Sequence, residues 1–137
     1  MAIIYANIEL INYDDLVLFR KGFIKEREIK RLVVKSLVDT GAYMLSIPEH
    51  LKEQLGLTIV DEREIELADG HIEKVPVAGG IEIHFENRKA LINGFVIGNE
   101  VLLGAIPMRE LDVVINPKKE TIEVNPENPY VPKYKMK

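Results

Sequence analysis

The segment that most constrains this chain is Val38-Asp39-Thr40-Gly41-Ala42, which directly follows an apolar run over residues 32–37. The apolar run predicts a buried strand, so the chain must place a carboxylate and a hydroxyl where that strand ends. The glycine that follows allows a tight turn and the close approach of a second backbone. Asp, Thr and Gly are also common turn residues, so a simple turn capped by Asp39 is the alternative. The interpretation of this segment therefore depends on the fold around it.

Most of the chain consists of short apolar or alternating runs separated by turn residues, a pattern that favours an all-β fold. The expected strands cover residues 3–11, 16–19, 28–38, 64–67, 72–77, 81–85, 90–97, 101–103, 112–115 and 121–124. Residues 12–15 are expected to form a turn. The clearest hairpin has its tip at Ala68-Asp69-Gly70-His71, because Asp-Gly between alternating runs is typical of a tight β-turn.

Only two short helices are expected. A capping-box spacing over residues 46–49 predicts a helix that ends at Gly56, and a second helix covers about residues 106–111. The segment 125–137 is rich in proline and lysine, which predicts either an edge segment or a disordered tail. We therefore interpret the chain as a single domain over residues 1–124 followed by a tail over residues 125–137.

A second glycine turn repeats part of the first one. Val101-Leu102-Leu103-Gly104-Ala105 shares the pattern Val-x-x-Gly-Ala with residues 38–42, and an Ile-Pro pair follows each segment within a few residues. We expect a strand, a glycine turn and a helix in both places. The second copy has Leu102 and Leu103 where the first has Asp39 and Thr40.

Composition limits the partners and cofactors. The chain has 137 residues, of which 47% are hydrophobic, enough for one core, and it has no cysteine, which excludes disulfides and thiolate zinc sites. The net charge of −4 argues against a nucleic-acid partner. His50, His71 and His84 lack the spacing of metal ligands, so we expect no metal and no other cofactor. The N-terminal segment lacks the basic start of a signal peptide, and no run could span a membrane. We expect no membrane partner and a cytoplasmic location.

Three features together resemble the retropepsin-like aspartic peptidases, in particular the prokaryotic relatives of the retroviral proteases. They are Asp39-Thr40-Gly41-Ala42 after an apolar strand, the central hairpin, and Leu102-Leu103-Gly104 before a short helix. The resemblance covers about residues 32–124 and is most evident over residues 103–117. It implies a small closed β-barrel with one or two short helices. It also implies that Asp39 is catalytic, that Thr40, Gly41 and Ala42 support it, that Ala68, Asp69, Gly70 and His71 form a substrate-covering flap, and that Leu102, Leu103 and Gly104 form a second glycine-turn loop.

The function implied by this resemblance is that of an aspartic endopeptidase, which hydrolyses a polypeptide through a water activated by two carboxylates. The chain has a single Asp-Thr-Gly, so the second catalytic Asp must come from another copy, and a homodimer is expected. One alternative is a non-catalytic dimeric peptide-binding or scaffold module with the same barrel. Another is an unrelated small barrel in which Asp39 only caps a turn.

The sequence departs from the viral pattern in two places. The viral flap is apolar and glycine-rich at its tip, whereas Asp69-Gly70-His71 is polar. The viral enzymes also place an arginine that braces the dimer after the late glycine, where this chain has Ala105. Arg109 lies too far along the chain to take that role by position. The substrate preference and the dimer contacts are therefore expected to differ.

Overall fold

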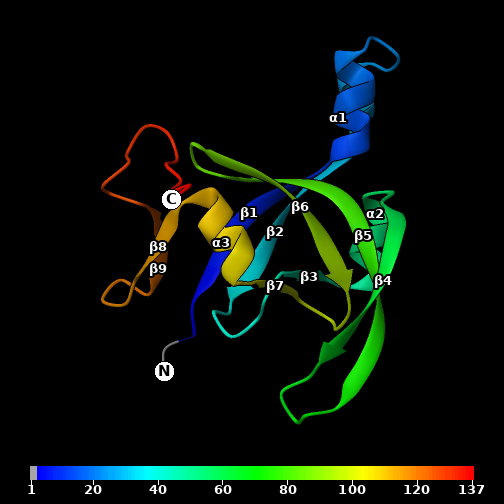
Figure 1. Cartoon of the computed structure of the whole chain (residues 1–137). Coiled ribbons are helices and arrows are strands. Elements are labelled where there is room, and N and C mark those ends of the chain that lie inside the picture. Colours follow the sequence, from blue (N-terminus) through cyan, green and yellow to red (C-terminus); the bar gives the residue numbers. More distant parts are fainter. Residues whose placement is uncertain (1–2) are drawn as a thin grey trace.

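The computed structural model describes residues 3–137 and contains a barrel closed by six strands (Figure 1). Around the barrel the strand order is β1, β2, β7, β3, β6 and β5, and β5 pairs with β1 to close the ring. These strands are β1 (Tyr5–Asn12), β2 (Arg31–Val38), β3 (Leu45–Ile47), β5 (Ile72–Phe85), β6 (Arg88–Val96) and β7 (Val101–Leu103). A further strand, β4 (Thr58–Glu66), pairs only with β5 and extends away from the ring. The predicted closed, mostly β barrel is confirmed.

Aliphatic side chains fill the inside of the barrel. Buried and exposed positions alternate along the first half of β1 and along most of β6, as expected for strands with one face on a core. The core combines residues from every strand of the ring with Leu55 and Leu111, which lie at the ends of two helices. This continuous core holds together strands that are far apart in the sequence, including the parallel pairs β2–β7 and β3–β6.

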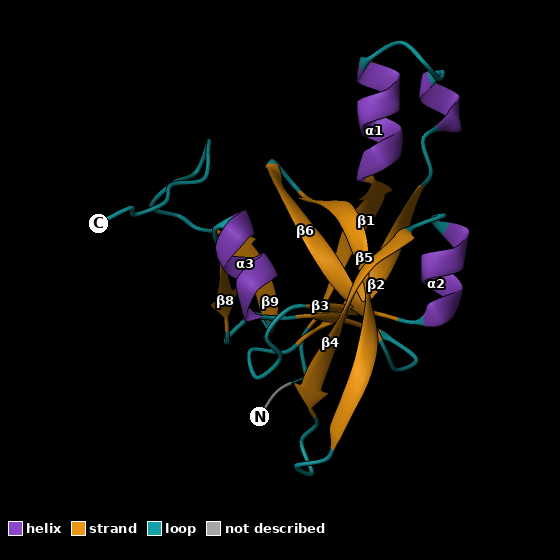
Figure 2. Cartoon of the chain, turned by 45° about the vertical axis from the view of Figure 1, so that its right-hand side comes forward, coloured by secondary structure: helices purple, strands orange, loops and turns teal. Residues whose placement is uncertain are grey.

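The strand expected over residues 16–19 is wrong, because these residues belong to helix α1 (Tyr13–Arg20). The expected turn over residues 12–15 is instead the start of this helix: the Asn12 side chain accepts a hydrogen bond from the Asp15 amide at 3.0 Å. Four apolar residues are too few to distinguish a period of two from a helical one. Helix α1 projects away from the barrel and is followed by a short 3₁₀ helix, η1 (Glu26–Glu28) (Figures 1 and 2).

The two predicted helices are present as α2 (Glu49–Gln54) and α3 (Ala105–Leu111), so the described residues contain three α-helices rather than two. The predicted capping box is wrong. Ser46 is buried within β3, and Pro48 is the N-cap of α2 without a side-chain hydrogen bond. Helix α2 ends as predicted, because Gly56 adopts a φ of +60°, which favours glycine.

The predicted central hairpin is confirmed. Strands β4 and β5 pair antiparallel, with Glu66 opposite Ile72 at the end of the ladder. At the tip, the Leu67 amide donates to the His71 carbonyl at 2.8 Å, and Gly70 has a φ of +85°. Residues 72–77 and 81–85, expected as separate strands, are one continuous strand, β5. Its pairing with β6 shifts register between Ala78 and Ile81.

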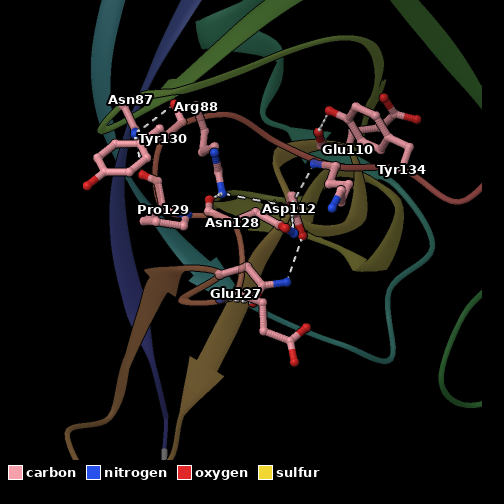
Figure 3. Close-up of polar contacts among 11 residues, drawn as sticks. Asn87, Arg88, Glu110, Asp112, Glu127, Asn128, Pro129, Tyr130 and Tyr134 are labelled. Carbon is pink, nitrogen blue, oxygen red and sulfur yellow. Dashed lines mark hydrogen bonds and ion pairs between the residues drawn. The ribbon is translucent and has the colours of Figure 1, made fainter.

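The C-terminal part forms a two-stranded sheet, β8 (Val113–Asn116) with β9 (Thr121–Val124), and then a coil packed against α3 (Figure 3). The Asp112 carboxylate, directly after α3, accepts hydrogen bonds from the Asn125 and Asn128 side chains and the Lys133 amide at 2.8–3.0 Å. The fully buried Arg88 donates to the Asn128 carbonyl. The segment 125–137 is therefore neither an edge strand nor a tail without contacts.

Candidate active site

Asp39 lies directly after β2, where this strand runs parallel to β7. Its backbone amide donates to the Leu103 carbonyl at 3.0 Å, which fixes the end of the strand against the second glycine segment. Its carboxylate oxygen Oδ1 accepts the Gly41 amide at 2.9 Å, whereas Oδ2 accepts no hydrogen bond from the described residues. The carboxylate is thus oriented through one oxygen, and the other remains available.

The two glycine segments contact each other directly. The Ala105 amide donates to the Ala42 carbonyl at 2.8 Å, and the Ile106 amide donates to the Tyr43 carbonyl at 3.0 Å. A Cβ atom on Gly104 would lie 2.4 Å from the Met44 carbonyl oxygen, so only glycine allows this approach. The start of α3 therefore packs against the loop that carries Asp39 and holds this loop in place.

An open groove of about 970 Å³ lies beside Asp39. One wall is strand β4 with the start of the hairpin tip, and the rest comes from the Asp39 loop, the end of β6, the loop after β6, and β7. The residues that line it are Asp39, Gly41, Ala42, Tyr43, Met44, Ser46, Arg63, Glu64, Ile65, Glu66, Leu67, Ala68, Phe95, Ile97, Gly98, Asn99, Glu100 and Leu102. This volume lies at the upper end of the range of about 300–1,000 Å³ that is typical of pockets for small ligands.

The predicted site residues divide into three groups. Those that line the groove are Asp39, Gly41, Ala42, Ala68 and Leu102. Leu103 and Gly104 are buried behind the Asp39 loop and support it. Thr40 is exposed next to Asp39, whereas Asp69, Gly70 and His71 form the exposed end of the hairpin and do not line the groove.

Sequence reasoning missed most of the residues that form the groove walls. Tyr43 and Met44 directly follow the Asp-Thr-Gly-Ala segment, and this proximity was the only available signal. Phe95, Ile97 and the loop from Gly98 to Glu100 enter the groove because β6 pairs with β3 and the chain then turns into β7. That arrangement depends on strand order, which no local pattern encodes.

Two further properties concern residues 3–137 only. No group of three or more His, Cys, Asp or Glu side chains in this part of the chain could hold a metal ion. None of its helices has the length and the apolar character that crossing a membrane requires.

No protein-family model matches the sequence, and no curated protein matches it. Among solved structures, the retroviral protease-like domain of Ddi1 from Leishmania major superposes with a TM-score of 0.56 at 12% identity, over 92% of this chain and 90% of that one. A retropepsin-like aspartic protease from Rickettsia conorii gives a TM-score of 0.46 at 14% identity, over 85% of this chain and 90% of that one. The Legionella pneumophila protein Lpg0085, of unknown function, gives a TM-score of 0.42 at 14% identity, over 82% of this chain and 91% of that one. Only the first of these likenesses is close enough to carry an argument.

The likeness to the Leishmania domain extends over nearly the whole of both chains. This chain therefore has the retropepsin-like fold, which confirms the resemblance found in its sequence. At 12% identity the likeness establishes the fold, and the chemistry has to be argued from the groove and its residues.

Proposed function

We propose that this chain is an aspartic endopeptidase that works as a homodimer, with one Asp39 from each copy. The observation that carries the proposal is the position of the Asp39 carboxylate. It lies at a large open groove in a retropepsin-like fold, with one oxygen held by the Gly41 amide and the other available. A carboxylate that served only to cap its turn would have no need of a groove.

In the proposed reaction, two Asp39 carboxylates face each other and share one proton, because two like charges at close range do not both ionise. The ionised carboxylate takes a proton from a water molecule, and the water oxygen bonds to the scissile carbonyl carbon. The protonated carboxylate donates its proton to the carbonyl oxygen. The carboxyl group that took the proton from water then donates it to the nitrogen, while the other carboxylate takes a proton from one hydroxyl of the tetrahedral intermediate. The C–N bond breaks, which releases an amine and a carboxylic acid and restores the shared proton.

The need for a second copy follows from the chain itself. It contains a single Asp-Thr-Gly, and the shared-proton mechanism requires two carboxylates. The Asp39 loop also presents the surface that a partner would contact: Thr40 and Gly41 are exposed, and Tyr43 is 66% exposed. In the proposed dimer, the Thr40 hydroxyl braces the partner loop by hydrogen bonding.

The proposed lid over the substrate is the β4–β5 hairpin. Ile65, Leu67 and Ala68 line the groove, while the polar tip at Asp69 and Gly70 extends beyond it. A lid of this kind would exclude water during the reaction and open for a polypeptide. Amide exchange measured with and without a bound inhibitor tests this role. We expect slower exchange over residues 66–73 in the complex, and unchanged exchange there would show that the hairpin is not the lid.

The direct test of the proposal is hydrolysis of a peptide library by the purified protein at acidic pH, with and without a statine-type transition-state mimic. We expect cleavage that the mimic inhibits and a specific activity that falls on dilution, as the dimer dissociates. Sedimentation at the assay concentration provides the matching oligomeric state. Peptide binding without any cleavage would instead identify a non-catalytic binding module, and a fully active monomer would contradict the shared site.

A further inference from the structure

The groove beside Asp39 has an uneven distribution of charge. Its lining includes four carboxylates, those of Asp39, Glu64, Glu66 and Glu100, and one guanidinium, that of Arg63. Arg63 is already paired, because its Nε lies 2.8 Å from Asp61 Oδ2, and Asp61 lies outside the groove lining. The positive charge in the groove is therefore largely compensated by a neighbour.

Glu66 and Glu100 have no such compensation, whereas Glu64 lies opposite Lys74 in the β4–β5 ladder. Among residues 3–137, the side chains of Glu64, Glu66 and Glu100 form no ion pair. They come from two separate elements, strand β4 and the loop between β6 and β7, and all three are exposed. A segment bound in the groove would therefore meet negative charge from both of these elements.

Between the carboxylates, the groove is apolar. Six large half-buried apolar side chains line it, those of Met44, Ile65, Leu67, Phe95, Ile97 and Leu102. Half-buried apolar surface favours apolar side chains of a ligand, since contact removes both surfaces from water. The groove thus combines apolar positions with negatively charged margins, and a ligand that matches both carries apolar and cationic side chains in one extended segment.

We infer that the groove selects polypeptides in which lysine or arginine flanks the apolar residues, and that Glu66 and Glu100 determine this selectivity. The inference rests on the proposed function and specifies its substrate class. Charge complementarity of this kind excludes acidic segments by repulsion as well as favouring basic ones. At the exposed surface of a groove, one close charge pair changes the affinity by up to about fivefold.

The test uses three fluorogenic peptides that share one apolar pair at the scissile bond and differ only in flanking Lys, Gln or Glu. We expect kcat/KM to decrease in the order Lys, Gln, Glu, by about two- to fivefold at each step at low salt. The differences should shrink at about 0.5 M salt, because screening then limits the interaction between exposed charges to a range of a few ångströms. Equal rates for the three peptides, or a preference for the Glu peptide, would overturn the inference.

Substitutions identify the residues that are responsible. Glu66→Gln and Glu100→Gln should each reduce the Lys-to-Gln ratio by about half, and Glu66→Lys combined with Glu100→Lys should favour the Glu peptide. Glu62→Gln is the matched control, because Glu62 is exposed on the same strand, β4, but does not line the groove. An equal change of the ratio in the control and in Glu66→Gln would assign the selectivity to general charge, and thus contradict the inference.

Binding separates this inference from the proposed chemistry. The same peptides, fluorescently labelled, are titrated into the Asp39→Asn variant, which retains the groove. If cationic peptides bind preferentially but the unmodified protein cleaves none of them, the peptidase proposal fails and the charge selectivity of the groove stands. If cleavage occurs without any charge order, the selectivity fails and the peptidase proposal stands.

Discussion

The two glycine segments of this protein show how similar local sequences serve different purposes. Residues 38–42 and 101–105 share the pattern Val-x-x-Gly-Ala, and in the fold they lie in direct contact. The first is half-buried to exposed and carries a carboxylate at the groove, whereas the second carries Leu103, which is fully buried in the core. One segment presents a carboxylate at the groove, and the other holds it in place through backbone hydrogen bonds.

The two glycines differ in the same way. A Cβ atom on Gly41 would meet only the Asp39 carboxylate, at 3.2 Å, whereas a Cβ atom on Gly104 would lie within 2.4–2.7 Å of two backbone carbonyl oxygens. Neither residue has a positive φ, so the left-handed region is not the reason for either glycine. Gly104 is required for close packing, and Gly41 leaves space beside the carboxylate that its amide orients.

The largest expected effect concerns Asp39. Asp39→Asn keeps the shape of the side chain but removes the proposed base, so we expect hydrolysis to fall by about 10³-fold or more, with stability nearly unchanged. Peptidase assays and thermal unfolding measure the two properties. The matched control is Asp69→Asn at the exposed hairpin tip, which should retain most of the activity. Turnover close to normal in Asp39→Asn would show that this segment is only a turn.

The next effect concerns the two glycines. Gly104→Ala forces the backbone apart at Met44 and Ala42, so we expect the free energy of unfolding to fall by about 2–4 kcal/mol. Gly41→Ala should cost less than about 1 kcal/mol in stability, yet it should reduce hydrolysis by crowding the Asp39 carboxylate. Urea unfolding and activity assays on both variants make the comparison. Equal losses of stability would contradict the distinction between a supporting segment and an active one.

A smaller effect is expected from Asp112, at the end of the helix that follows Gly104. The hydrogen bond from the Asn125 side chain does most to lower the pKa of Asp112 below its ordinary value, while partial burial raises it. Because the pKa of Asp112 is lower in the folded than in the unfolded state, its ionised carboxylate stabilises the fold. This stabilisation is fully present above the unfolded pKa of about 4 and is lost as the pH falls through the folded pKa.

Asp112→Asn should therefore be less stable than the unmodified protein by about 1–2 kcal/mol at pH 7, and the difference should narrow below about pH 4. Urea unfolding at several pH values measures it. Glu127→Gln provides the control, since the exposed Glu127 side chain accepts no hydrogen bond from the described residues. A difference that does not vary with pH would show that the charge of Asp112 is unimportant for holding the C-terminal segment.

The smallest expected effect tests whether the exposed segment needs a second copy. When unmodified protein and Asp39→Asn exchange subunits at a ratio of one to one, only about a quarter of the dimers contain two Asp39 residues. Activity per total protein should then be about a quarter of that of the unmodified protein alone. A value of about one half would indicate that each subunit acts independently.

The sequence alone determined the features that depend on neighbouring residues. The β4–β5 hairpin follows from two alternating runs and Asp69-Gly70, and Gly70 has the positive φ that such a turn requires. The placement of Asp39 at the end of a strand likewise follows from the apolar run before it. Strand and turn preferences act over a few residues, so they can be recognised without knowledge of the fold.

Only the tertiary structure decided which of these elements meet. Helix α1 was missed because its four apolar residues also fit a strand, and what orients its Asn12 cap is in part the distant Leu55 carbonyl, which accepts the Asn12 side-chain amide at 2.8 Å. The C-terminal segment is held because it supplies an acceptor to Nη2 of the buried Arg88 and donors to the Asp112 carboxylate. The groove likewise combines segments that are far apart in the chain. Contacts of this kind are selected by burial of a common core and by satisfaction of buried polar groups, which depend on the whole folded chain.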